Sequence, residues 1–215
     1  MRVTKKIKAE QLRRLSIAYA GEGTMLKYTS PFTLLVAVIL SAQCTDKRVN
    51  IITDRIFPRL DTPEKMGALT QAELEREIHD CGLYKSKAKN LLGMCHMLSE
   101  EYDGKVPDDF NKLLKLPGVG RKSANLIMGD VFGKPAIVTD THCIRLCNRI
   151  GLVDGIKEPK KVEMELWKII PPEEGSDFCH RLVYHGRDVC TARTKPHCEK
   201  CCLADICCKQ ILSLI

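Results

Sequence analysis

Aromatic residues are scarce in this chain of 215 residues, where one Trp, five Tyr and five Phe make up only 5%. Segments in which apolar and polar residues alternate with a period of two are scarce as well. The helix-favouring residues Leu, Lys, Glu, Ala and Met are common instead. These features argue against a β-sheet architecture and predict an all-helical protein.

Long hydrophobic segments and signal sequences are also missing. The longest apolar run, FTLLVAVIL at 32–40, has roughly half the length of about 20 residues that a membrane-spanning helix needs. The N-terminus is basic but has no apolar signal region, and the chain contains no internal repeat or low-complexity tract. We therefore expect a soluble, intracellular protein without a targeting signal or membrane contact.

Positive charge is in excess, with 34 Lys and Arg against 27 Asp and Glu and a formal net charge of +7. Such a balance is typical of proteins with a polyanionic partner, and nucleic acid is the first candidate. Many basic proteins have this charge only because it keeps them soluble. Charge alone therefore leaves the partner open.

Hydrophobic periodicity and capping residues predict a series of helices. Ser86 is the expected cap of the helix whose apolar face includes Leu91 and Leu98, and the KPAIV stretch at 134–138 is expected to be an extended linker between two lobes. The expected helices are at about 8–20, 31–43, 46–57, 71–79, 86–99, 108–115, 121–132, 141–150, 160–170 and 176–187.

The stretch LPGVGRKSANLIM, residues 116–128, joins two of these helices through a proline and two glycines. Pro117 presets φ, and Gly118 and Gly120 allow the backbone conformations of a tight connection. Backbone N–H groups at the start of the second helix, together with the helix dipole, suit a phosphate, and Arg121 adds a positive charge. The pattern is that of a helix-hairpin-helix, which contacts the DNA backbone. A plain turn between two helices would contain the same proline and glycines.

Lys122 follows this hairpin directly. The expected buried face of its helix comprises Ala124, Ile127, Met128 and Val131, so Lys122 should project from nearly the opposite side and be exposed. A solvated surface lysine is the ordinary interpretation. A nucleophilic amine is the alternative, and it would require loss of the proton through desolvation or a neighbouring positive charge.

Asp140 lies in the segment VTDTHCIRLCNRIG, just before another expected helix. The plain interpretation of an Asp at this place is a helix N-cap. A carboxylate held near a lysine can instead stabilise a developing sugar cation or accept a proton. The sequence leaves both roles open.

Six of the twelve cysteines lie within the last 26 residues, in a tail that includes CTARTKPHCEKCCLADICC. Four of them are separated by seven, two and five residues, a spacing that can hold a 4Fe-4S cluster or a zinc ion. The single CxxC favours iron–sulfur slightly, because zinc sites more often pair two such knuckles. The expected ligands are Cys190, Cys198, Cys201 and Cys207, with Cys208 as an alternative to Cys207.

In combination, LPGVGRKSAN, VTDTHCIRLCNRIG, HGRDVC and the cysteine tail resemble the endonuclease III family, from about residue 10 to 208. The resemblance implies an all-α fold of two helical lobes with a helix-hairpin-helix motif and a C-terminal iron–sulfur cluster loop. A six-helix domain would occupy 24–134, with the hairpin at about 108–132. Residues 1–23 and 135–215 would form the second domain, with the cluster loop at 190–208.

The resemblance also implies a base excision repair enzyme, a bifunctional DNA glycosylase and abasic-site lyase that removes oxidised pyrimidines. In that interpretation Lys122 attacks the sugar C1′ of a flipped nucleotide and forms a Schiff base, Asp140 assists, and β-elimination cuts the strand. The implied cofactor is a 4Fe-4S cluster, and the implied partner is duplex DNA with damaged bases or abasic sites. We expect a monomer that is cytoplasmic and nucleoid-associated if the host is bacterial.

Further residues match positions that contact DNA or the damaged nucleotide in the family. Gln43 would fill the gap left by the flipped base, and Leu83 would act as a wedge. Asp46 and His142 are expected near the pocket. The remaining expected DNA contacts are Gly118, Gly120, Arg121, Arg145, Arg193 and Lys195. The first gap between cysteine ligands is one residue longer than the family's usual six, which alters a loop expected to contact DNA.

Two alternatives stay open at this point. A mismatch-specific glycosylase of the same superfamily would share the hairpin, the aspartate and the cluster, but it would lack a lysine at position 122. A non-catalytic DNA-binding module with a structural zinc ion would need neither Lys122 nor Asp140. Lys122 argues against the first alternative, and the joint presence of Lys122 and Asp140 argues against the second.

Overall fold

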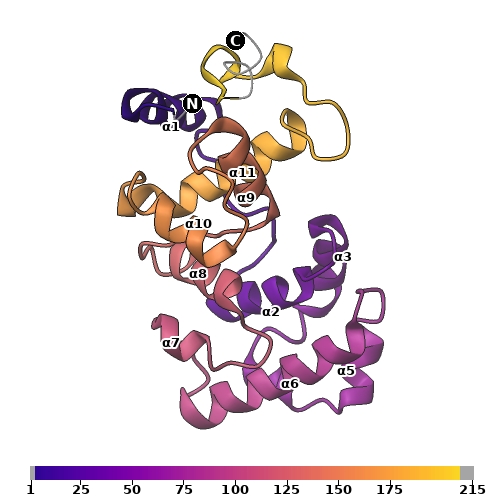
Figure 1. Cartoon of the computed structure of the whole chain (residues 1–215). Helices are drawn as coiled ribbons and strands as arrows, with labels where there is room; N and C mark the ends of the chain where they lie inside the picture. Colours follow the sequence, from indigo (N-terminus) through magenta and orange to yellow (C-terminus); the bar gives the residue numbers. More distant parts are fainter. Residues whose placement is uncertain (1–2, 209–215) are drawn as a thin grey trace. The chain divides into compact units, whose positions relative to one another are not determined.

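The computed structural model describes residues 3–208, and every regular element within this range is a helix (Figure 1). The expected all-α fold is therefore confirmed. None of the helices in the described range is long and apolar enough to cross a bilayer.

The chain divides into two compact units. The hairpin unit is the continuous segment Thr24–Phe132, and the terminal unit combines the described parts of Met1–Gly23 and Gly133–Ile215. Each unit has its own set of helices and is described separately below.

The hairpin unit is built around a helix that is buried on all sides. Residues 32–40 of this helix are all buried, and it contacts three other helices of the unit. Ser30 and Thr33 form a capping box at its start, where Pro31 is the first helical residue. The helices are α2 (Pro31–Ser41), α3 (Asp46–Ile56), α4 (Pro63–Gly67), α5 (Gln71–Glu77), α6 (Tyr84–Glu101), α7 (Phe110–Leu113) and α8 (Arg121–Asp130).

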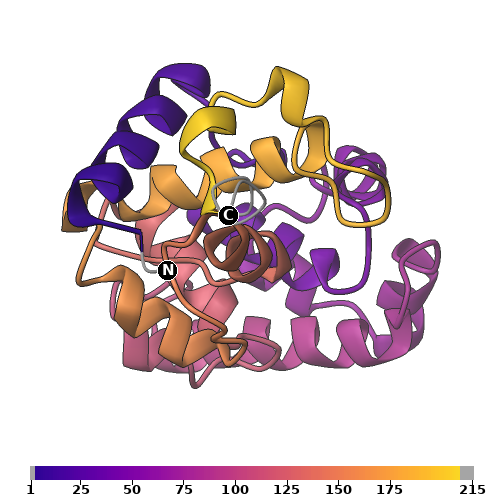
Figure 2. The same ribbon diagram turned by 45° about the horizontal axis from the view of Figure 1, so that its top comes forward.

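The terminal unit joins the N-terminal helix to segments from the second half of the chain. Gln11 is fully buried, and its Nε2 donates hydrogen bonds to Ile150 O at 2.9 Å and Ile206 O at 3.0 Å. Figure 2 shows the N-terminal helix and the C-terminal segment within this unit. Its helices are α1 (Lys5–Ala18), α9 (Thr141–Ile150), α10 (Pro159–Leu166) and α11 (Gly175–Asp188), with short 3-10 turns η1 (Pro172–Glu174), η2 (Cys198–Lys200) and η3 (Ala204–Ile206).

Several element boundaries differ from the sequence predictions. Ser86 is not the cap of α6, because that helix begins earlier and its N-cap is Leu83 in a left-handed conformation. The short α4 was not predicted, so the hairpin unit contains seven α-helices rather than six. α10 ends at Leu166, and Ile169 beyond it is half-buried. Residues 134–138 are neither helix nor strand, as expected.

Candidate functional site

The connection between α7 and α8 is a tight hairpin. Gly118 has φ of +80°, a conformation that side-chain-bearing residues rarely adopt. The backbone N–H of Val119 donates to Leu116 O at 3.1 Å and closes the turn. Gly120 is the N-cap of α8 and has no side chain, so the N-cap residue itself makes no side-chain hydrogen bond to the first turn of the helix. This end of the helix has the local geometry that favours an anion.

The two cationic side chains after the hairpin have different environments. The Arg121 guanidinium lies over the Phe110 ring, 5.0 Å from its centroid, and the side chain is half-buried. Lys122 is exposed, whereas Ala124 and Ile127 on the opposite face are buried. The exposure expected for Lys122 is therefore observed.

Two other predicted DNA-contacting residues of the hairpin unit occupy left-handed turns. Gln43 has φ of 53° and follows α2, and Leu83 has φ of 61° and precedes α6. Gln43 is exposed, and Leu83 is 56% exposed although it is a large apolar residue. Asp46, the first residue of α3, is half-buried. A left-handed conformation is uncommon for a residue other than glycine, and strained positions of this kind cluster at functional sites.

The sequence analysis overlooked Lys87, which is only 4% exposed. Its Nζ donates to Leu40 O at 2.8 Å and Ala42 O at 2.7 Å, and lies 3.1 Å from Cys81 Sγ. A signal for this burial exists in the sequence: Lys87 lies four positions before Leu91, on the apolar stripe of α6.

In the terminal unit, Asp140 is the N-cap of α9. Its Oδ1 accepts a hydrogen bond from the backbone N–H of Cys143 at 2.7 Å. The plain capping role is therefore present, and it occupies one carboxylate oxygen. His142, the second residue of the same helix, is half-buried.

Arg145, a predicted DNA contact, points to the backbone of its own unit. Its Nη2 donates to Gly186 O and to Cys190 O, both at 3.1 Å. Burial lowers the pKa of Arg145, and the neighbouring Arg149 contributes in the same direction. These bonds fix α9 against the C-terminal end of α11, so the guanidinium has a structural role whether or not it also contacts DNA.

The four predicted cysteine ligands line one small cavity of the terminal unit, together with Arg149 and His185. Arg149 Nη1 lies 3.4 Å from Cys190 Sγ, and the Leu203 N–H lies 3.4 Å from Cys201 Sγ. Donors of this kind stabilise sulfur ligands of a metal cluster. As they stand, no three His, Cys, Asp or Glu side chains within residues 3–208 are arranged so that they could hold a metal ion.

A buried histidine adjoins this cavity. His185 Nε2 lies 3.5 Å from Cys201 Sγ, and its Nδ1 lies 3.0 Å from the Tyr19 hydroxyl. Burial lowers the pKa of His185 to about 4 and raises the pKa of the Cys201 thiol to about 11. A thiolate at Cys201 would therefore need a cation to stabilise it, as a metal cluster does.

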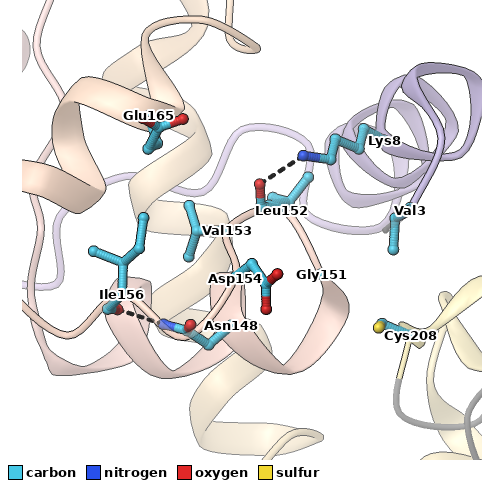
Figure 3. Close-up of a pocket in the computed structure, with 10 residues that line it drawn as sticks. All are labelled: Val3, Lys8, Asn148, Gly151, Leu152, Val153, Asp154, Ile156, Glu165 and Cys208. Carbon is cyan, nitrogen blue, oxygen red and sulfur yellow. Dashed lines mark hydrogen bonds between the residues drawn. The ribbon is translucent and has the colours of Figure 1, made fainter. Parts of the chain in front are cut away.

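Cys208 and Cys207 line different cavities of the terminal unit. Figure 3 shows Cys208 beside a cavity of about 390 Å³ that Val3 and Gly151 also line. The same cavity contains the Lys8 Nζ bond to Leu152 O, 2.8 Å long. This placement favours Cys207 over Cys208 as the fourth sulfur of the cysteine-lined cavity.

Comparisons with known proteins place this geometry in a family. The family of HhH-GPD superfamily base excision DNA repair proteins matches residues 36–172. Endonuclease III of Rickettsia conorii is 47% identical over 184 residues, which cover 86% of this chain and 87% of that protein. The chain belongs to the endonuclease III family. Two solved structures have the same fold at a TM-score of 0.92 and 40% identity: a non-covalent endonuclease III–DNA complex, covering 99% of both chains, and a trapped endonuclease III–DNA covalent intermediate, covering 99% of this chain and 100% of the other.

Membership in the endonuclease III family establishes the activity at the level of the reaction class. This family member is a base excision repair DNA glycosylase with abasic-site lyase activity, as the sequence analysis predicted. The roles of its individual residues and its substrate range are the subject of the proposal that follows.

Proposed function

We propose that this family member removes oxidised pyrimidine bases from duplex DNA, with Lys122 as the nucleophile. The observation that carries this proposal is the exposed amine of Lys122 at the second position of α8, directly after a hairpin that ends in the N-cap Gly120. A phosphate held at the hairpin would place the adjoining sugar near this amine. The trapped DNA intermediate of a protein 40% identical to this one supports a covalent mechanism.

The reaction requires Lys122 as a neutral amine. Nζ forms a bond to the sugar C1′ while the bond from C1′ to the base breaks, and the departing base takes the electron pair and a proton. Opening of the sugar ring gives an imine. Loss of a proton from C2′ then expels the 3′ phosphate, and water releases the lysine by hydrolysis of the imine.

Asp140 is proposed to assist departure of the base. Its Oδ1 is occupied by the backbone N–H of Cys143, so the carboxylate has a fixed orientation. A carboxylate held in this manner can stabilise positive charge that develops on the sugar or accept a proton.

The base must leave the stack before its C1′ becomes accessible. We propose that the exposed Leu83 separates the neighbouring bases and that Gln43 fills the gap, while Gly118, Gly120 and Arg121 bind the phosphate backbone. Arg193 and Lys195 are exposed in the loop after Cys190 and would add phosphate contacts. Asp46 and His142 would border the extruded nucleotide.

Borohydride trapping tests the central claim. A duplex with one thymine glycol should give a reduced covalent complex with the unaltered protein, and Lys122→Gln should give none. Lys115→Gln removes a positive charge from the same hairpin and should still be trapped. Trapping of Lys122→Gln at the unaltered level would overturn the assignment.

A panel of duplexes that each contain one defined lesion, measured under single turnover, tests the substrate class. Gel filtration of the protein tests the proposed monomer. Oxidised pyrimidines should be excised and undamaged mismatches should not. Excision of mismatched thymine alone would favour the mismatch-specific alternative.

Because its proposed substrate is DNA, we expect this protein to be found at the nucleoid if the host is bacterial.

The same family member is proposed to hold a 4Fe-4S cluster through Cys190, Cys198, Cys201 and Cys207. The chemistry of these residues suits such a group, because the four cysteines line one cavity and N–H donors from Arg149 and Leu203 reach the sulfur atoms of two of them. When bound, the cluster would cross-link the C-terminal loop to α11 and thereby hold Arg193 and Lys195 in a defined loop.

Spectroscopy and metal analysis test the cofactor. A preparation made without oxygen should be brown, absorb in the visible blue, and contain about four iron atoms for each chain. A colourless preparation that contains only zinc would favour the alternative of a structural zinc site.

A further inference from the structure

Lys87 is a buried cation, and none of the three hydrogen-bond partners of its Nζ is a carboxylate. They are the carbonyl oxygens of Leu40 and Ala42, at 2.8 and 2.7 Å, and the sulfur of Cys81 at 3.1 Å. Buried lysines are rare unless a partner compensates their desolvation. Here the compensation comes from the C-terminal carbonyls of α2, where the helix dipole is negative.

These partners connect two turns that are distant in the sequence. Ala42 O directly precedes Gln43, and Cys81 is two residues before Leu83. Cys81, only 1% exposed, also donates from its thiol to Leu40 O at 3.3 Å. One ammonium group therefore contacts both turns from the inside of the hairpin unit.

The two turns also lie against each other. A Cβ atom built on Gly82 would be 3.4 Å from Gln43 O, which is ordinary van der Waals contact. Both Gln43 and Leu83 have positive φ, at 53° and 61°. For residues other than glycine, such conformations cost about 1 kcal/mol or more each, so they persist only where the surroundings hold them.

We propose that Lys87 is a positioning residue for base extrusion, which holds the Gln43 turn and the Leu83 turn together as one preformed wedge. The proposal rests on the function proposed above, in which these two side chains enter the duplex. A preformed wedge binds without ordering two separate loops, so the binding free energy is available for unstacking the bases.

Replacement of Lys87 by Met keeps a long, helix-favouring side chain and removes all three N–H donors. The carbonyls of Leu40 and Ala42 would then lose a buried partner, and the turns would no longer be held in place. The matched control is Lys89→Met, which removes an exposed lysine from the same helix.

The experiment compares two substrates under single turnover. A stacked thymine glycol must be extruded before its base is released, whereas a duplex with a preformed abasic site has no base to unstack. Lys87→Met should slow base release by about tenfold and slow cleavage of the abasic strand far less. Lys89→Met should match the unaltered protein on both substrates.

Two outcomes would overturn the inference. One is that Lys87→Met has the same rates as the unaltered protein on both substrates. The other is that Lys87→Met is slowed by the same factor on both substrates, which indicates a general structural role. Failure of the unaltered protein on both substrates would instead refute the proposed function.

If Lys87→Met does not fold, a second variant is Cys81→Ala, which removes one of the three hydrogen-bond partners of Lys87 Nζ. It should change the ratio of the two rates in the same direction, and an unchanged ratio would count against the inference.

Discussion

At the scale of single residues, the two glycines of the hairpin have different roles. Gly118 has φ of +80°, and a Cβ built on it would be 3.0 Å from Asn90 Cβ. Gly120 has φ of −96° and open space around it. The first glycine is therefore required by the conformation of the turn, and the open space around the second is where the proposed phosphate contact would be made.

Alanine at each position should separate these roles. We expect Gly118→Ala to lower the free energy of unfolding by about 1–2 kcal/mol, because an L-residue is strained at positive φ. Gly120→Ala should change it by about 0.5 kcal/mol or less. Urea unfolding followed by circular dichroism measures both, and equal losses would contradict the assignment of strain to Gly118.

The residues that sequence reasoning recognised are those with a local signal. Lys122 follows a hairpin of proline and glycines within a few positions, and the cysteines are identified by their spacing. Lys87 has a local signal for burial, its place on the apolar stripe of α6, but its hydrogen-bond partners are 45 and 47 positions away in the sequence and could not be predicted. His185 lies on the apolar face of α11 with Phe178 and Leu182, and its contacts with Tyr19 and Cys201 depend on the tertiary fold.

At the scale of helices, Asp140 combines a structural and a proposed chemical role. As the N-cap of α9 it satisfies the Cys143 N–H with a 2.7 Å hydrogen bond. Such a cap also orients the carboxylate, because one oxygen is fixed by the helix. Loss of activity after a substitution here therefore has two possible causes, which differ in their effect on stability.

Two substitutions of Asp140 should resolve them. Asp140→Asn keeps a capping side chain and should leave the free energy of unfolding within about 0.5 kcal/mol, whereas Asp140→Ala should lower it by about 1 kcal/mol. If the carboxylate acts in base release, both variants should lose single-turnover activity to a similar extent. Full activity of Asp140→Asn would leave Asp140 with the capping role alone.

Helix positions were predicted well where an apolar stripe and a cap agree, as at 141–150, which coincides with α9. The start of α6 was placed too late, because its cap is a left-handed Leu83 rather than a hydroxyl side chain. No propensity rule predicts leucine at such a position. The deviation from local rules therefore coincides with the residue that is proposed to enter DNA.

At the scale of the whole molecule, the formal net charge of +7 predicts that DNA binding depends strongly on salt. Arg193 and Lys195 are both exposed. Replacing either by Ala should lower the slope of log affinity against log salt by about 1, because one fewer counterion is released. Lys160→Ala, on α10, is the control and should keep the slope. Fluorescence anisotropy with a labelled duplex over a salt series would measure the slope. Unchanged slopes for both loop variants would contradict the proposed DNA contacts of Arg193 and Lys195.

Hydrophobic patterning predicted the helical class but could not show which helices pack together. The contacts of α2 with α6 and α8 connect segments more than forty residues apart. Hydrophobic periodicity does not predict which helices pack together at that distance in the sequence. The resemblance to a known family supplied the expected domain limits at 24–134 and for the two ends of the chain, and these limits stay predictions.

The hydrogen bonds of Gln11 have a consequence for the order in which the protein is assembled. Gln11 Nε2 bonds to Ile206 O, 195 positions further along the chain, whereas the hairpin unit is one continuous segment. During synthesis the hairpin unit can fold as soon as it has left the ribosome, while α1 must wait for the last part of the chain. The residues of α1 are thus made before the hairpin unit but find their partners after it. Ribosome-bound chains that stop before residue 206 should protect the hairpin unit, but not α1, from proteolysis.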